Sequence, residues 1–266
     1  MRPLSFTWLG HATFLFTSPG GKRILLEPWV ASNPACPDSH KKVGHLDLIL
    51  ITHGHSDHAG DAVSIARATG AHVIANYEVC LWLEAKGIQN TAPMGQGGTL
   101  RLAGRGLVAL RQAQGDPEQG RRVEERARAG QAPEIGDISI TMVNAVHGSS
   151  VVEDGRVVSL GQAAGYVIRF EDGVTIYFAG DTDIFGDMRL IAELHRPSIA
   201  FLPIGDRFTM GPAAAARAVE LLAVRQVVPM HYGTFPFLTG TAAEFRKLVE
   251  PKGVQVLELQ PGETAT

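Results

Sequence analysis

The chain has 266 residues, of which 45% are hydrophobic and 19% charged, and its formal net charge is -3. This length is enough to bury a sizeable core, and the composition is typical of a globular protein. The small negative charge provides no overall basic field for nucleic acid or for an anionic membrane.

The N-terminus and the cysteines predict a soluble, cytoplasmic protein. The segment Met1–Trp8 lacks the apolar core of a signal peptide, and no stretch approaches the length of a transmembrane helix. Cys36 and Cys80 are far apart and form no CxxC pair, so we expect reduced thiols rather than a disulfide or a thiolate zinc site.

The first half begins with short strands and continues with alternating strands and helices. The expected strands lie between turn residues at 5–9, 12–17, 23–27, 46–52 and 73–75. Helices are expected at about 61–69 and 78–86. The segment from Leu46 to Thr52 is almost continuously apolar, which predicts a strand covered on both faces.

The segment at about 101–133 differs from its surroundings. It contains no aromatic residue, many glycines and a charged run at 121–126. This composition predicts an inserted, solvent-exposed surface segment, and a lid over an active site is the alternative.

The second half again has strands first and then strands alternating with helices. We expect strands at 138–146, 162–170, 174–179, 199–204, 227–230 and 254–259. We expect helices at about 188–194, 212–223 and 242–248. Two such halves predict a single α/β (α+β layered) domain over 1–266, in which two sheets pack face to face with helices outside.

The strongest functional signal lies directly after the apolar strand. Within six residues the chain places three histidines and one aspartate, His53, His55, Asp57 and His58. Neutral imidazole and carboxylate together suit zinc, iron, manganese or nickel. A polar loop with surface histidines is the alternative, but chance produces this spacing rarely.

Further ligand candidates follow other predicted strands. His147, Asp181 and His231 each come directly after an apolar segment. Layered sheet proteins place ligands at strand ends, so we expect these three side chains to complete the site. His40, His45, His72 and His195 have no such context, and we expect them at the surface.

Motifs spread over nearly the whole chain resemble one known family. They are Leu9–Ala12, Thr52–Asp61, Ala75–Glu78, Ala179–Thr182, Leu202–Asp206, Phe208–Pro212 and Pro229–Pro236. The sequence resembles the metallo-β-lactamase superfamily, whose hallmark is HxHxDH followed by a distant His, an Asp and a last His. More closely, it resembles the UPF0173 metal-dependent hydrolases, a branch related to L-ascorbate-6-phosphate lactonases.

The resemblance implies an αββα sandwich and a site for two divalent metal ions. Zn²⁺ is the first expectation, with Mn²⁺, Fe²⁺ or Ni²⁺ as alternatives. One metal is implied on His53, His55 and His147, and a second on Asp57, His58 and His231, with Asp181 bridging. One departure is Glu27-Pro28, where the family usually has Asp before Pro.

Such a site predicts hydrolysis of an ester, lactone or phosphoester bond in a small molecule. Two cations that share a water lower its pKa toward ~7, so a metal-bridged hydroxide is expected to be the nucleophile. We expect Asp57 and His11 to be catalytic, Asp57 as ligand and water-orienting group. Arg207, Tyr232 and Thr234 are expected to bind substrate.

Two other function classes remain as alternatives. A metal-binding protein without turnover would carry the same ligands. A flavodiiron-like oxidoreductase would have Glu where His55 stands and would carry a flavodoxin domain. The sequence predicts neither a nucleic-acid partner nor a membrane partner, and it leaves homo-oligomerisation, the substrate and the native metal open.

Overall fold

The computed structural model describes residues 2–103, 106–107 and 138–266. Most of the predicted surface insertion at about 101–133 therefore lies outside the described residues. Within the described part of the chain, no helix combines the length and the apolar character needed to cross a membrane.

The first sheet contains the N-terminal strands. Among the described residues it has seven strands, in the order β17-β1-β2-β3-β4-β5-β6. They are β1 (Ser5–Trp8), β2 (Phe14–Thr17), β3 (Arg23–Leu26), β4 (Leu48–Leu50), β5 (His72–Asn76), β6 (Thr91–Met94) and β17 (Thr264–Ala265). The strands from β17 to β3 are antiparallel, and those from β3 to β6 are parallel.

The second sheet has eight strands within the described ranges, in the order β16-β15-β14-β13-β12-β9-β7-β8. They are β7 (Thr99–Ala103), β8 (Gly106–Leu107), β9 (Ile138–Asn144), β12 (Ala164–Arg169), β13 (Thr175–Phe178), β14 (Ile199–Pro203), β15 (Gln226–Met230) and β16 (Gln255–Val256). The strands β12 and β13 pair as an antiparallel hairpin, whereas β13 to β16 run parallel.

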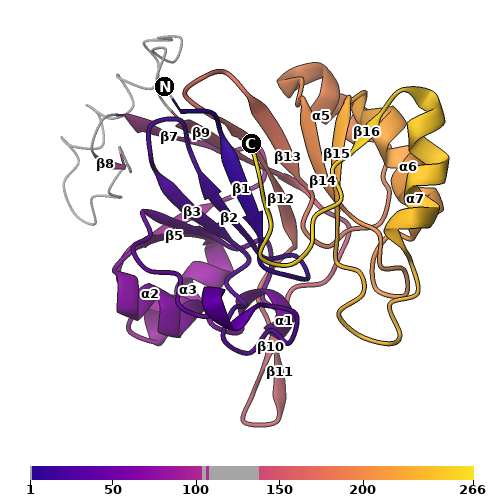
Figure 1. The fold of residues 1–266 in the computed structure, drawn as a ribbon. Coiled ribbons are helices and arrows are strands. Elements are labelled where there is room, and N and C mark those ends of the chain that lie inside the picture. The colour runs from indigo at the N-terminus through magenta and orange to yellow at the C-terminus, as the bar shows by residue number, and fades with distance from the viewer. Residues whose placement is uncertain (1, 104–105, 108–137) are drawn as a thin grey trace.

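Helices cover the outer faces of the two sheets (Figure 1). On the first sheet lie α2 (Ala62–Thr69) and α3 (Tyr77–Ala85), and on the second lie α5 (Met188–His195), α6 (Pro212–Leu222) and α7 (Ala242–Val249). Short helical turns are α1 (Ser56–Ala59), η1 (Asp38–His40) and η2 (Glu250–Lys252). The predicted αββα layering is confirmed.

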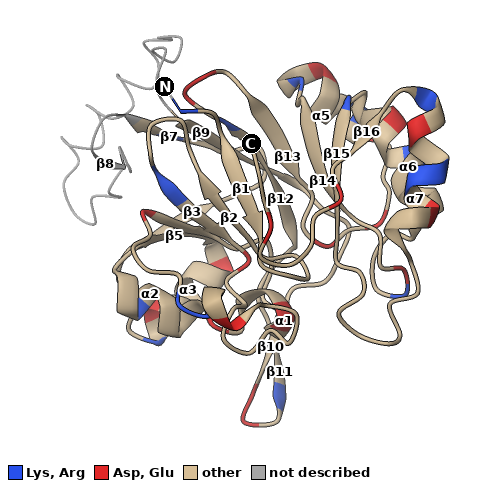
Figure 2. Cartoon of the chain, viewed as in Figure 1, with Lys and Arg blue, Asp and Glu red and all other residues tan. Residues whose placement is uncertain are grey.

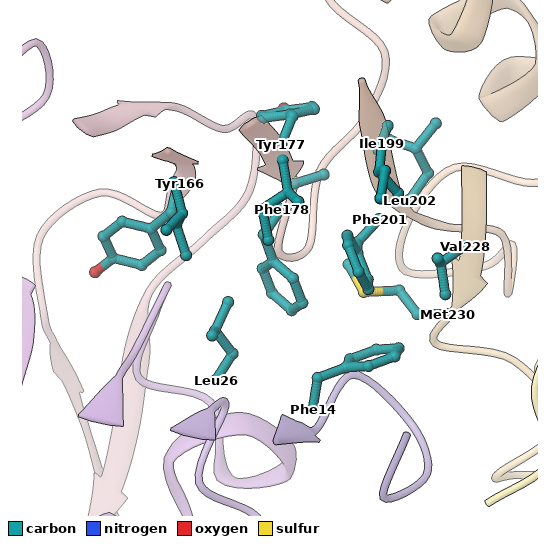
Figure 3. Close-up of a cluster of buried hydrophobic side chains, with 14 of the residues drawn as sticks. Phe14, Leu26, Tyr166, Tyr177, Phe178, Ile199, Phe201, Leu202, Val228 and Met230 are labelled. Atoms are coloured by element: carbon teal, nitrogen blue, oxygen red, sulfur yellow. The ribbon is translucent and has the colours of Figure 1, made fainter. Parts of the chain in front are cut away.

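The main hydrophobic core lies between the two sheets. Phe14 and Leu26 of the first sheet point toward Phe178 and Phe201 of the second (Figure 3). The ring centroids of Phe14 and Phe201 are 5.0 Å apart in an edge-to-face arrangement, which aromatic pairs prefer. This packing fixes the distance between the sheets, and therefore between the loops at their edges.

The central strand β4 contacts two cores, as its continuous apolar sequence predicted. Leu48 and Leu50 belong to the core between the sheets, whereas Ile49 and Ile51 pack under α2 and α3. Successive side chains of a strand point to opposite faces, so an apolar residue is needed at every position. The loop after β4 is thus anchored from both sides.

A small hairpin that the sequence analysis missed projects from the base of the molecule (Figure 1). Its strands are β10 (Ser150–Glu153) and β11 (Arg156–Ser159), which pair with each other and with no other described strand. The turn consists of Asp154 and Gly155, both with positive φ. Asp-Gly between β-branched residues is a strong hairpin signal, so this element was recognisable in the sequence.

Charged side chains are distributed over the helices and loops, whereas the strands carry few of them (Figure 2). Both α6 and α7 carry acidic and basic residues, and ion pairs link them to neighbouring segments, as in Glu220–Lys252 and Arg246–Glu258. Mixed surface charge of this kind creates no extended field of one sign.

Candidate metal centre

The seven predicted ligands come from loops that follow the carboxyl ends of strands. The motif His53–His58 follows β4 and enters α1. His147 follows β9, Asp181 follows β13 and His231 follows β15. The structure brings all seven together at the ends of these strands, although they are spread over 179 residues from His53 to His231.

Three histidines form the first group of candidate ligands. His53 Nε2 lies 3.0 Å from His55 Nδ1, and His147 Nε2 lies 3.3 Å from the same atom. Tetrahedral nitrogen ligands at 2.0–2.1 Å from a zinc ion are separated by about 3.3 Å. The spacing of these nitrogens therefore fits a single cation between them.

A second group lies beside the first and contains Asp57, His58 and His231, together with His11. These four side chains present donor atoms within 4.8 Å of one another. These two groups contain the same side chains as the two sets that the resemblance implies, with His11 as an additional neighbour, and Glu27, His53 and His58 form a third group that overlaps both.

Asp181 lies between the two groups. Its Oδ2 is 3.0 Å from His231 Nε2 and 3.2 Å from His58 Nε2 in the second group. In the first group it is 3.7 Å from His147 Nε2 and 4.0 Å from His53 Nε2. One carboxylate oxygen thus approaches imidazoles of both groups, as a bridging ligand must.

Buried polar atoms at the centre lack hydrogen-bond partners. Among the described residues, His58 Nε2 and His231 Nε2 lie near Asp181 Oδ2 without a well-directed hydrogen bond, and Asp181 Oδ1 has no partner. A buried polar group without a partner costs about 1–3 kcal/mol. Cations held between these atoms would remove that cost, so the donor set fits the metal ions that the sequence predicted.

The charge states suit a metal site. Burial lowers the pKa of His53 far below its usual value and also lowers those of His55 and His147, so these rings are neutral near pH 7. Burial would raise the pKa of Asp181, but the neighbouring His231 and His58 outweigh it and hold that pKa well below its usual value. The centre therefore offers neutral imidazoles and a carboxylate.

His58 behaves differently because carboxylates lie on both sides of its ring. Burial lowers the pKa of His58, but Asp181 and Glu27 outweigh the burial and raise it well above the usual value. In the metal-free protein a proton on Nε2 occupies the position that a metal ion would take. Binding of the cation would therefore release that proton.

Glu27 orients two of the histidines. Its Oε2 accepts hydrogen bonds from His58 Nδ1 at 2.5 Å and from Thr52 Oγ1 at 3.0 Å. Thr52 Oγ1 also lies 2.9 Å from His53 Nδ1. Because the carboxylate only accepts, Thr52 donates to Glu27 and accepts from His53, which leaves Nε2 of both histidines free for a metal.

The side chain of Glu27, longer than the usual Asp, therefore reaches both candidate ligands: His58 directly and His53 through Thr52. Glu27 is fully buried, and its φ is +55°. His11 and His231 also have positive φ values, 56° and 57°. Such a conformation is strained for a non-glycine residue and clusters at functional sites, where the surrounding fold enforces it. Sequence reasoning did not detect this strain.

We expect Glu27→Gln to weaken metal binding by roughly 10- to 100-fold, the usual effect of removing such an orienting group. The amide NH₂ of the new side chain would donate where Glu27 accepts from Thr52 Oγ1 and His58 Nδ1. The rings of His53 and His58 would then favour the tautomers that carry the proton on Nε2, the nitrogen that a metal needs. Titration of the metal-free protein with Zn²⁺ against a competing chelator measures the change. Glu193→Gln, at an exposed helix position, is the matched control; equal affinities for the two variants would contradict the orienting role.

His11 is fully buried beside Asp57. Its Nε2 lies 3.2 Å from Asp57 Oδ2, and its Nδ1 lies 3.0 Å from Thr234 Oγ1. Burial lowers the pKa of His11 to about 4, so the ring is neutral at pH 7. Since Asp57 only accepts, Nε2 carries the proton and Nδ1 accepts from Thr234. Thr234, which was predicted to bind substrate, therefore donates its hydroxyl hydrogen to His11.

The other two predicted substrate residues lie beyond the ligand cluster. The ring of Tyr232 stacks on Trp8 at 5.4 Å and packs against the main core. The guanidinium of Arg207 lies 5.6 Å from the ring centroids of both Phe208 and Phe237. The contacts of Tyr232 are those of a packing residue, and those of Arg207 are with exposed aromatic side chains rather than with the cluster.

The two cysteines are buried free thiols, as expected. The four remaining histidines, His40, His45, His72 and His195, lie outside the metal-binding groups found among the described residues.

The chain is similar to known metal-dependent hydrolases over nearly its whole length. Residues 22–232 match the family model described as a beta-lactamase superfamily domain. A UPF0173 metal-dependent hydrolase of Rubrobacter xylanophilus is 45% identical over 260 residues, which cover 97% of this chain and 94% of the relative. Another, from Koribacter versatilis, is 45% identical over 264 residues, with 99% and 98% covered.

Solved structures share the fold over almost the full length. A metallo hydrolase from Ignicoccus hospitalis superposes with a TM-score of 0.75 at 32% identity and covers 98% of this chain and 97% of its own. An isothiocyanate hydrolase from Delia radicum gut bacteria has a TM-score of 0.68 at 20% identity, with 98% of both chains covered. At that identity the likeness concerns the fold.

Proposed function

Because this chain belongs to the metallo-β-lactamase superfamily, and within it to the UPF0173 metal-dependent hydrolases, we propose that it hydrolyses an ester, lactone or phosphoester bond of a small molecule with two bound divalent metal ions. Zn²⁺ is the metal that we expect first, since imidazole and carboxylate ligands suit it.

One observation carries this proposal. Asp181 Oδ2 lies within 4.0 Å of imidazole nitrogens from both ligand groups, and the buried atoms around it lack other partners. Two groups that share one carboxylate support two neighbouring ions rather than one. Bound there, the ions would lower the pKa of a shared water toward ~7 and polarise the substrate oxygen.

Asp57, held by His11, would then orient the attacking water and accept its proton. The pKa of Asp57 lies below its usual value: burial would raise it, but His11, hydrogen-bonded to the carboxylate, and His58 nearby outweigh the burial. Asp57 is thus ionised at neutral pH, and its partly exposed side chain can accept a hydrogen bond from a water molecule and, if bound ions make that water acidic, its proton. His11, fixed by Thr234, donates to Asp57 and holds it in place.

Metal content and turnover together test the proposal. We expect the purified protein to contain close to two equivalents of metal and to hydrolyse at least one substrate in a panel of esters, lactones and phosphodiesters. Dialysis against a chelator should abolish the rate, and added Zn²⁺ should restore it. Full metal loading without turnover on any substrate would favour the metal-binding alternative instead.

A further inference from the structure

We propose that the β10–β11 hairpin and α3 form a pocket that binds an uncharged apolar group of the substrate, with Trp82 and Val151 as the specificity-determining residues. This inference rests on the proposed function, because it names the substrate class of the same site. The pocket has a volume of about 390 Å³, within the range of small-molecule sites.

The pocket begins at the proposed metal centre. One wall contains His55 and Asp57, the loop residues from the two ligand groups, followed by Ala59 and Gly60 of the α1 region. A substrate with its reacting group at the metals would therefore extend directly into this space. Because His55 and Asp57 are the candidate ligands that line it, the pocket is placed to receive a group attached to the reacting bond.

The opposite wall comes from α3 and the hairpin. Trp82 and the β10 residues Val151, Val152 and Glu153 line it. Trp82 and Val151 are partly buried and pack against the core under α2 and α3, so both present fixed apolar surface. The lining also includes Ser56 and Ser150, so the apolar part of the pocket is the surface of Trp82, Val151 and Val152, which can bind an apolar group by excluding water.

The charged residues that line the pocket disfavour the binding of an anion. Its charged residues are Asp57 and Glu153, and among the described residues no lysine or arginine lines the pocket. Lys86, the cation nearby, is paired with Glu153 Oε1 at 2.6 Å. A phosphate or carboxylate in this space would meet two carboxylates without a free cation, at a cost in desolvation and repulsion.

Glu153 has a positioning role in this arrangement. Its Oε1 accepts a hydrogen bond from Trp82 Nε1 at 2.7 Å while it pairs with Lys86. These contacts fasten the tip of β10 to α3 and fix the indole ring. The acceptor capacity of this oxygen is thereby used within the protein, and the face left for the substrate is the apolar one.

Binding of hydroxamates tests the pocket without any turnover. The hydroxamate group takes the place of the reacting group at the Zn²⁺-loaded centre, and its alkyl tail enters the pocket. We expect affinity, measured by calorimetry, to rise roughly 2- to 4-fold per methylene from acetohydroxamate to hexanohydroxamate. Glutaric monohydroxamate, which ends in a carboxylate, should bind no better than acetohydroxamate.

Two pairs of variants test whether the dependence of affinity on the hydroxamate tail arises in this pocket. Trp82→Ala should flatten the dependence on chain length, whereas Leu81→Ala, at an exposed neighbouring position outside the pocket, should keep it. Val151→Lys should improve binding of the carboxylate-tipped compound several-fold. Its cross-strand partner Val158, which does not line the pocket, supplies the control Val158→Lys.

The outcomes separate this inference from the proposed function. Affinity that is independent of tail length in the wild-type protein, with acetohydroxamate still bound, would overturn the pocket and leave the hydrolase intact. Affinity that rises with tail length and is lost in Trp82→Ala would support the pocket even if no ester, lactone or phosphodiester were hydrolysed. Stronger binding of the carboxylate-tipped than of the neutral compound would overturn the assigned substrate class.

Discussion

Asp181→Ala is expected to reduce metal content to below one ion per chain and to lower turnover by about 10³-fold or more. The side chain is almost fully buried and approaches imidazoles of both ligand groups. Removing this carboxylate leaves the surrounding imidazoles without their shared partner and would weaken both ion sites, and a ~10³-fold loss of turnover corresponds to ~4 kcal/mol of lost transition-state stabilisation. Elemental analysis and initial rates on the same preparation measure both effects.

Asp183→Asn is the matched control for this experiment, since Asp183 lies two residues further in the same loop and is exposed. It should retain both ions and the full rate. An Asp181→Ala protein that keeps two ions with wild-type affinity would show that the two groups do not share this carboxylate, and the assignment of a bridging ligand would be wrong.

Asp57→Ala is expected to separate metal binding from turnover. The first ligand group and Asp181 do not depend on Asp57, so at least one ion should remain bound. Turnover should fall by about 10²–10⁴-fold, the usual contribution of a positioned proton acceptor. The comparison of metal content with rate therefore distinguishes this variant from Asp181→Ala, which is expected to lose both.

The conservative change Asp57→Asn sharpens the test. It keeps an oxygen for the second ion but removes the carboxylate that accepts a proton and the hydrogen bond from His11. We expect a rate as low as that of Asp57→Ala with a metal content nearer to wild type. An active, fully loaded Asp57→Ala protein would refute the catalytic role, and Asp187→Ala at an exposed site serves as the control.

Several parts of the fold were predictable because their signals are local. The apolar run before His53 predicted a strand covered on both faces, and Leu50 and Ile51 do contact different cores. Pro212 after Gly211 marked the start of α6. The ligand candidates were identifiable because imidazole and carboxylate side chains rarely gather at strand ends without a shared task.

Other features depend on contacts between distant segments and therefore left no pattern in the sequence. Glu27 meets His58 and Thr52 only after β3 and β4 have paired, so its orienting role required coordinates. Trp82 looks like an ordinary helix residue until Glu153 of the hairpin, 71 positions later, accepts its proton. Tyr232 was assigned from its neighbour His231, yet its ring packs on Trp8.

The pairing of β17 with β1 bears on how the protein can be synthesised. Thr7 and Thr264 are hydrogen-bonded across 257 positions of sequence, and Phe6 lies opposite Ala265. Until the ribosome has released the segment around residue 264, the backbone of β1 has an unpaired edge. Bare strand edges recruit other chains, so the segment around residue 264 protects β1 against aggregation once the two strands have paired.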